Sequence, residues 1–218
     1  MKVAIVATLA ALPVAIGFAY LLARTRFPGK TLLDAVLHLP LVLPPVVTGY
    51  VLLLLFGRKG PAGAWLYEHL GIVFSFRWTG AALAAAIMGF PLMLRAIRLS
   101  FESIDRRLED AAGSLGASGL WTFVLVTLPL ALPGVLAGAV LGFAKALGEF
   151  GATITFVSNI PGETQTIASA IYTYTQVPGG DASAMRLMSV SIVIALGAVV
   201  LAEVMNQRMQ RRIAVYER

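Results

Sequence analysis

Residues 110–129 read DAAGSLGASGLWTFVLVTLP, a stretch that is rich in small residues at its start and apolar at its end. Apolar blocks flank it on both sides. Small residues on a helical turn let another surface approach the backbone, and Gly116 suits the left-handed conformation that ends many helices. The stretch therefore predicts a short helix at which the chain meets a partner protein.

The composition around this stretch is that of a membrane protein. Hydrophobic residues make up 58% of the 218 positions, charged residues make up 13%, and the mean hydropathy is +0.83. The apolar residues form long blocks, whereas helices of a soluble protein would carry polar faces. We therefore expect an all-α integral membrane protein whose residues 1–218 form a single transmembrane domain. Because the chain has no cysteine, helix packing in lipid must stabilise it without disulfides.

Blocks long enough to cross a bilayer occur five times. A helix needs roughly 20 apolar residues to cross the hydrocarbon core, where every backbone group must be hydrogen-bonded within the protein. We expect Pro44 and Pro45 to kink the second span. The predicted spans cover residues 3–23, 35–56, 78–94, 133–157 and 184–202.

The first apolar block also resembles a secretory signal peptide, because Met1 and Lys2 precede it. Its apolar run is longer than the roughly 7 to 15 residues of a signal core. Arg24, Arg26 and Lys30 follow it, where a cleavage region would be neutral. A retained span is therefore favoured.

The distribution of basic residues predicts the topology. With the N-terminus outside, eleven of the seventeen basic residues fall in cytoplasmic segments, as the positive-inside rule requires. We therefore expect a multi-pass protein of the bacterial cytoplasmic (inner) membrane, in contact with its lipid, with a cytoplasmic C-terminus. The pI near 10 then reflects topology and not nucleic-acid binding. The eleven residues are Arg24, Arg26, Lys30, Arg95, Arg98, Arg106, Arg107, Arg208, Arg211, Arg212 and Arg218.

In this topology residues 102–128 form a cytoplasmic loop. Apolar positions at helical spacing predict two short helices on either side of Gly116. Ser103 and Ser118 are suitable N-caps for the two helices. An amphipathic linker resting on the headgroups would give the same pattern without any partner.

The spacing resembles the EAA loop of ABC importer permeases, E-A-A-x3-G-x9-I-x-L-P. Asp110 stands for the glutamate, and Glu109 lies one position earlier as a possible substitute for it. Val126 stands for the isoleucine. The resemblance implies a type I ABC importer permease fold, in which this loop docks as a coupling helix on the ATP-binding subunit. The identical positions are Ala111, Ala112, Gly116, Leu128 and Pro129.

Other segments are similar to the molybdate branch of these permeases. They are residues 27–30 (FPGK), 38–50 (HLPLVLPPVVTGY) and 147–166 (LGEFGATITFVSNIPGETQT). The GEFGA block is shared with permeases for sulfate, whereas SNIPGET is particular to the molybdate branch. The resemblance implies a permease that moves molybdate, and also tungstate, by alternating access.

The resemblance also implies partners for this chain. It implies a homodimer with the pathway at its axis, since five spans would hardly enclose an alternating-access pathway alone. Two ATP-binding subunits would dock on the cytoplasmic loops. A periplasmic or lipid-anchored molybdate-binding protein would deliver the anion from outside.

An ATP site within the chain itself is excluded. Gly29-Lys30-Thr31 mimics the end of a phosphate-binding loop, but Arg24 stands where a Walker A motif needs its first glycine. No strand precedes it. The chain is therefore expected to be a transport subunit and not an enzyme, without cofactor or metal.

Two charged residues fall inside the fourth span. Lys145 and Glu149 are four residues apart and share one helix face, so an ion pair between them is favoured over direct contact with a passing anion. The alternative is that they line or gate the pathway. Gly148 and Gly151 permit close helix approach or bending there. The candidate pathway residues are Pro44, Pro45, Thr48, Lys145, Gly148, Glu149 and Gly151.

Two rival functions stay open at this point. One is an ABC permease for sulfate or another oxyanion, which differs only in cargo. The other is an ATP-independent secondary transporter, which would usually carry paired broken helices in repeat halves and carboxylates that bind a coupling ion, features that we expect this chain to lack apart from Glu149.

Overall fold

The computed structural model describes the backbone of residues 1–216 and the side chains of residues 1–204 and 207. Arg208, Arg211, Arg212 and Arg218 of the topology count therefore lie outside the described side chains. The elements in chain order are α1 (Lys2–Arg24), α2 (Lys30–Val42), α3 (Pro45–Phe56), α4 (Pro61–Leu70), α5 (Trp78–Ser103), α6 (Arg106–Ser114), α7 (Gly119–Thr122), the π turn η1 (Phe123–Thr127), α8 (Leu128–Leu147), α9 (Gly151–Val157), α10 (Ile167–Thr175) and α11 (Asp181–Tyr216).

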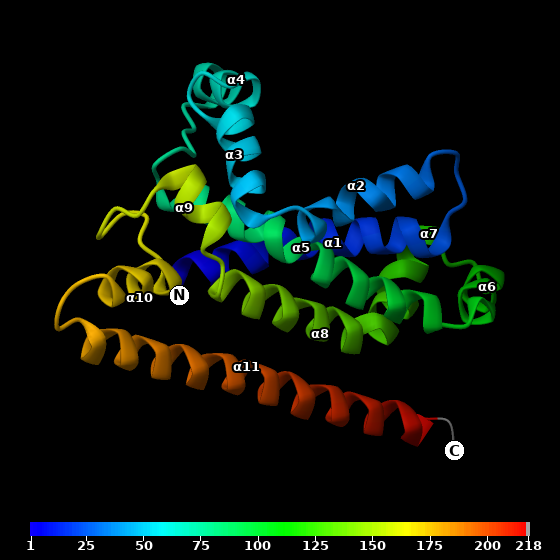
Figure 1. Cartoon of the computed structure of the whole chain (residues 1–218). Helices are drawn as coiled ribbons and strands as arrows, with labels where there is room; N and C mark the ends of the chain where they lie inside the picture. Colours follow the sequence, from blue (N-terminus) through cyan, green and yellow to red (C-terminus); the bar gives the residue numbers. More distant parts are fainter. Residues whose placement is uncertain (217–218) are drawn as a thin grey trace.

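Helices α1, α5 and α8 pack side by side as the centre of the molecule (Figure 1). They pack through small residues, which let helix backbones come close where lipid gives no hydrophobic drive for association. One close approach joins Gly89 of α5 to Gly142 of α8, where a Cβ on Gly89 would lie 3.0 Å from the Gly142 oxygen. Helix α1 contributes a stripe of buried alanines at helical spacing: Ala4, Ala7, Ala11, Ala15 and Ala19.

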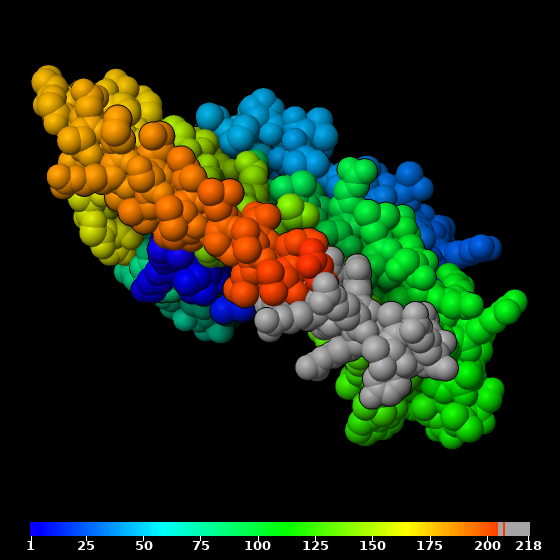
Figure 2. Space-filling view, turned by 90° about the horizontal axis from the view of Figure 1, so that it is seen from below, coloured from blue at the N-terminus to red at the C-terminus, as the bar shows by residue number. Residues whose placement is uncertain are grey.

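The expected all-helical membrane fold with about five spans is confirmed. Four helical stretches are long and apolar enough to cross a membrane, and a bent pair of helices makes a fifth. The last stretch, Asp181–Val204 in α11, lies along the outer side of the bundle (Figures 1 and 2). Its exposed surface is largely apolar, with Val193 69% and Val200 60% exposed, as expected of a lipid-facing helix. The other three stretches are Lys2–Arg24, Trp78–Ser103 and Gly119–Leu147.

The second expected span, residues 35–56, is broken and not merely kinked. Helices α2 and α3 meet at an angle of 115°. Leu43 and Pro44 are both extended, with ψ of 143° and 134°. Each of them precedes a proline, and the following ring disfavours the helical conformation in both. Two consecutive extended residues separate the helices completely, whereas a single proline would only bend one helix.

The fourth expected span, residues 133–157, is also divided. Helix α8 starts earlier, at Leu128, and ends at Leu147, and the short helix α9 starts at Gly151 after residues 148–150. The N-cap residue of α9 is Phe150, which has no side-chain cap. The Glu149 carboxylate, one residue earlier, accepts a hydrogen bond from the Ala152 N–H at 2.9 Å and so satisfies one of the free amides of the first turn.

The loop expected over residues 102–128 contains the two predicted helix starts on either side of Gly116, α6 after Asp105 and α7 after Ser118, but only α6 is a separate short helix. Helix α5 continues to Ser103, so Ser103 is not the cap of α6. The second predicted helix, after Ser118, runs on through the π turn η1 into α8 as one stretch, Gly119–Leu147. Its sequence is apolar, and no stop signal precedes Leu128, so nothing ends the helix at the membrane surface.

Candidate functional site

Helix α6 is a short polar helix with a defined start and stop. The Asp105 carboxylate accepts a hydrogen bond from the Arg107 N–H at 2.9 Å and caps its first turn. At its end Gly116 has φ of +89°, and the Ala117 N–H donates to the Ala112 carbonyl at 3.1 Å. This is the Schellman arrangement, which needs a left-handed residue after the cap. The predicted helix stop at Gly116 is therefore confirmed.

The two acidic residues of α6 point in different directions. Glu109 faces the bundle, and its side chain is only 18% exposed. Asp110 is exposed to the surroundings, as are Ala111 and Gly116, while Ala112 is half-buried on the Glu109 side. Since α6 buries none of its residues completely, its outer face is largely exposed.

A buried arginine holds the inner face of α6. The Arg24 guanidinium lies 3.1 Å from the Glu109 carboxylate, and the Arg24 side chain is 8% exposed. The Thr127 hydroxyl donates to the same Glu109 oxygen at 2.8 Å. Sequence reasoning used Arg24 for topology and against a signal peptide and a Walker A motif, but it did not pair Arg24 with Glu109 and it overlooked Thr127. The sequence did contain a signal for this contact: Arg24 is a charged residue at the end of an apolar helix, and such a charge needs a charged partner if it is buried.

The EAA-like motif of residues 110–129 ends on a different element from the one on which it begins. Val126 belongs to the π turn η1, and Leu128 and Pro129 form the first residues of α8. Val126 and Leu128 are half-buried, while Pro129 is exposed. The motif therefore spans the junction between the open helix α6 and a helix of the central bundle (Figure 1).

The two broken helices lie against each other. A Cβ on Gly151, at the start of α9, would lie 2.7 Å from the Pro45 Cβ. A Cβ on Gly49 of α3 would lie 2.5 Å from the Ala152 carbonyl oxygen. Backbones can approach this closely only where no side chain intervenes, so glycine is required at both positions. The structure thus brings together breaks that are about a hundred positions apart in the sequence.

The candidate pathway residues lie at or near the two helix breaks, one between α2 and α3 and the other between α8 and α9. Lys145 and Glu149 form the expected ion pair, with 3.0 Å between nitrogen and oxygen, and Glu149 is 2% exposed. Thr48 is buried, and its hydroxyl has no hydrogen-bond partner among the residues that the structure describes. Gly148 caps the end of α8, and Pro44 is exposed beside the α2–α3 bend.

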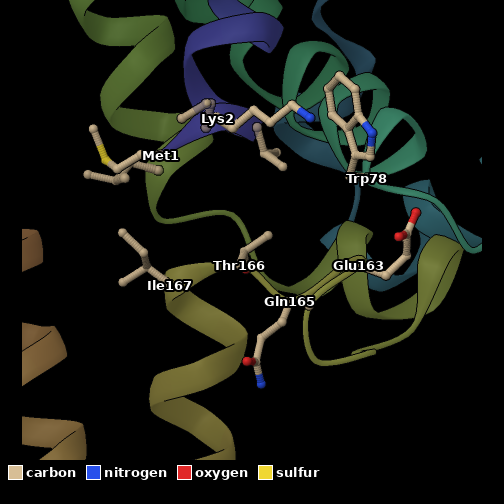
Figure 3. A pocket seen from close by; sticks show the side chains of 12 residues that line it. Met1, Lys2, Trp78, Glu163, Gln165, Thr166 and Ile167 are labelled. Atoms are coloured by element: carbon tan, nitrogen blue, oxygen red, sulfur yellow. The ribbon is translucent and has the colours of Figure 1, made fainter.

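The end of the molecule away from α6, where the N-terminus lies (Figure 1), carries a pocket of about 190 Å³ (Figure 3). Lys2 stacks over Trp78 there, with its nitrogen 3.6 Å from the ring centroid. The other wall comes from the α9–α10 loop, which includes Glu163. That loop is held from within by Thr164, which accepts from the Ile160 N–H at 2.8 Å.

Comparisons with known proteins agree with this architecture. The family described as "Binding-protein-dependent transport system inner membrane component" matches residues 11–215. The molybdenum transport system permease protein ModB of Escherichia coli (strain K12) is 59% identical over 203 residues, covering 93% of this chain and 89% of that protein. The sulfate transport system permease protein CysT of the same strain is 36% identical over 179 residues, 81% of this chain and 64% of that protein.

A solved structure shows the same fold. The bacterial alginate ABC transporter, solved in complex with an alginate pentasaccharide-bound periplasmic protein, matches with a TM-score of 0.70 at 17% identity. The match covers 96% of this chain and 77% of that chain. The fold of this multi-pass protein is thus that of ABC importer permeases. The chain belongs to the binding-protein-dependent transport system inner membrane components.

Proposed function

We propose that this chain is the membrane-spanning permease subunit of an ATP-driven importer of molybdate, and also of tungstate, a near-isosteric oxyanion. The observation that carries the proposal is an open polar helix, α6, fixed to the apolar bundle where the family motif lies. Similarity to a molybdenum permease along 93% of the chain supports the cargo. The sulfate permease is more distant, which makes sulfate the second candidate.

The partner at α6 is an ATP-binding subunit. The outer face of α6 carries the charged Asp110 and the apolar Leu108 and Leu115, which are 48% and 90% exposed. Such a mixed surface suits a protein cleft better than headgroups or water alone. Since the chain lacks a Walker A motif, the free energy of ATP hydrolysis enters through this contact. Binding of ATP must favour one state of the permease over the other for this to drive transport.

The end that carries α6 faces the cytoplasm in this proposal. Arg106 is the first residue of α6 and donates to the Arg24 carbonyl. Arg24 lies at the same end, because it also pairs with Glu109 of α6. Lys2 and the pocket with Trp78 lie at the opposite end, which faces outward. The positive-inside rule supports this orientation, with the N-terminus outside and the C-terminus in the cytoplasm of a bacterial cell.

The pathway lies between two copies of the chain, each binding one ATP-binding subunit. The free side of α3 supports a homodimer, since Val46 and Tyr50 are 55% and 54% exposed beside the helix breaks. Broken helices line pathways in many transporters because their free backbone groups can meet a solute. Pro44, Pro45 and Thr48 would then border the pathway from α3.

The outward end receives the periplasmic or lipid-anchored molybdate-binding protein. The α9–α10 loop is suited to docking because internal hydrogen bonds fix its shape. The Asn159 amide donates to Thr173 at 2.7 Å, and the Thr164 hydroxyl donates to the Ser158 carbonyl at 3.2 Å. A preformed loop loses little conformational entropy when a partner binds it.

Reconstitution tests this function directly. The chain is placed in liposomes with its ATP-binding subunit and its binding protein, and uptake of molybdate and sulfate is measured with and without ATP. We expect ATP-dependent molybdate uptake that tungstate inhibits more strongly than sulfate does. Equal uptake of sulfate would remove the cargo assignment. Uptake without ATP would instead support a secondary transporter.

A further inference from the structure

The last turn of α1 is the meeting point of several elements at the α6 end. The Arg24 guanidinium donates to the carbonyl of Ile104, which follows α5, at 3.0 Å. The same guanidinium nitrogen lies 3.1 Å from the Glu109 carboxylate of α6. One side chain of α1 therefore contacts both the end of α5 and the coupling helix.

A second contact continues from Glu109 to α8. Its oxygen Oε1, which pairs with Arg24, also accepts a hydrogen bond from the Thr127 hydroxyl at 2.8 Å. Thr127 is fully buried at the end of the π turn, directly before α8. A single carboxylate oxygen thus connects α6 to two helices of the central bundle.

Few other contacts could hold α6 in place. None of its residues is fully buried, so apolar packing contributes little to its position. Hydrogen bonds that involve a charged group are roughly twice as strong as neutral ones. Both partners of Glu109 are shielded from water, which strengthens these bonds further.

We propose that Arg24, Glu109 and Thr127 are positioning residues that make α6 move as one body with α1 and α8. This inference rests on the proposed function, since it assumes that a partner acts on the outer face of α6. Asp110 belongs to that outer face, while Glu109 belongs to the inner one. Without the inner contacts, a movement of α6 would no longer be transmitted to the bundle.

The first variants remove hydrogen-bonding capacity without changing shape. Glu109→Gln removes the charge, and Thr127→Val removes the hydroxyl. In reconstituted complexes we expect ATP hydrolysis to persist while the molybdate transported per ATP hydrolysed falls by about tenfold or more, given the strength of such bonds. A purely structural role would reduce the number of folded complexes and leave this ratio unchanged.

Two control variants are matched to these changes: one keeps the hydroxyl at position 127, and the other makes the Glu→Gln change at a different acidic residue. Thr127→Ser retains the hydroxyl and should keep the wild-type ratio. Glu102→Gln makes the same change at an exposed acid at the end of α5, where the carboxylate pairs with Arg98 at 2.7 Å. It should also keep the wild-type ratio. Unchanged ratios in both Glu109→Gln and Thr127→Val would overturn the inference.

A distance measurement separates this inference from the proposed function. The chain has no cysteine, so spin labels can be attached at two introduced cysteines, Gly113→Cys in α6 and Gly17→Cys in α1. Both glycines have free space around their Cβ positions. We expect one narrow distance distribution in the otherwise unchanged chain and a broad one in Glu109→Gln and Thr127→Val. Equal widths would contradict the inference even if molybdate uptake were normal, and absent uptake would contradict only the function.

Discussion

Helix α6 and the pair of broken helices are both departures from straight membrane spans, yet different forces hold them. Helix α6 buries none of its residues and is held by polar contacts to Glu109. Helices α3 and α9 approach through glycine, with Gly49 against Ala152. A substitution can remove one polar contact and leave the others, whereas a side chain added between two closely packed backbones disturbs their whole contact. We therefore expect the two regions to respond to different kinds of substitution.

The ion pair beside the breaks should give the largest effect. Lys145→Met leaves the 2% exposed Glu149 carboxylate buried without its counter-ion. Losing one partner of a buried pair is strongly destabilising, and we expect a loss of about 3 kcal/mol in unfolding free energy. Thermal unfolding in detergent measures this loss.

A double variant sharpens that prediction. Lys145→Met combined with Glu149→Gln removes both charges and keeps an oxygen that can accept from the Ala152 N–H. We expect most of the lost stability to return. If it does, the pair is structural, and normal uptake by the double variant would argue against anion contact at Lys145. A single Lys145→Met variant as stable as wild type would contradict the prediction.

The glycine contact between the broken helices should give the next effect. Gly49→Leu places a side chain where the Ala152 carbonyl oxygen lies 2.5 Å from the Cβ position. Overpacking typically costs about 1 to 3 kcal/mol, and we expect the upper end because backbone atoms must move. Gly17→Leu in α1 is the matched control, since nothing lies within 4 Å of its Cβ position. Equal melting temperatures for the two variants would show that α3 and α9 are not tightly packed.

The helix stop of α6 should give the smallest effect on stability. Gly116→Ala places a Cβ on a residue with φ of +89°, which costs about 1 to 2 kcal/mol. Because α6 is held by few contacts, we expect this strain to displace its end and reduce ATP-driven uptake while the bundle still folds. Gly113→Ala, three residues earlier in α6, adds the same methyl group without a positive φ and should preserve uptake. Loss of uptake in both variants would point to bulk, and not to strain, as the cause.

The sequence predicted the parts of the fold that depend on neighbouring residues. Apolar blocks of sufficient length located the helical spans, and the Gly116 stop followed from the backbone freedom of glycine. The sequence also predicted the ion pair of Lys145 and Glu149 from their spacing of four residues, although Glu149 lies just beyond the end of α8 and not on a shared helix face. From the sequence we predicted only a kink at Pro44 and Pro45, where the structure has a complete break. The cause is nevertheless visible in the sequence, because Leu43 and Pro44 each precede a proline and are therefore disfavoured in a helix.

By itself, then, the sequence determined the membrane-spanning helical class and the left-handed stop at Gly116 that ends α6, because hydropathy and backbone sterics act locally. Only the tertiary structure decided that Glu109 faces inward and Asp110 outward, and that Arg24 reaches across 80 positions to the end of α5. It also decided that the two breaks adjoin at Gly49 and Gly151. Partners of buried charges and closely packed glycines are set by helix packing, which no local pattern encodes.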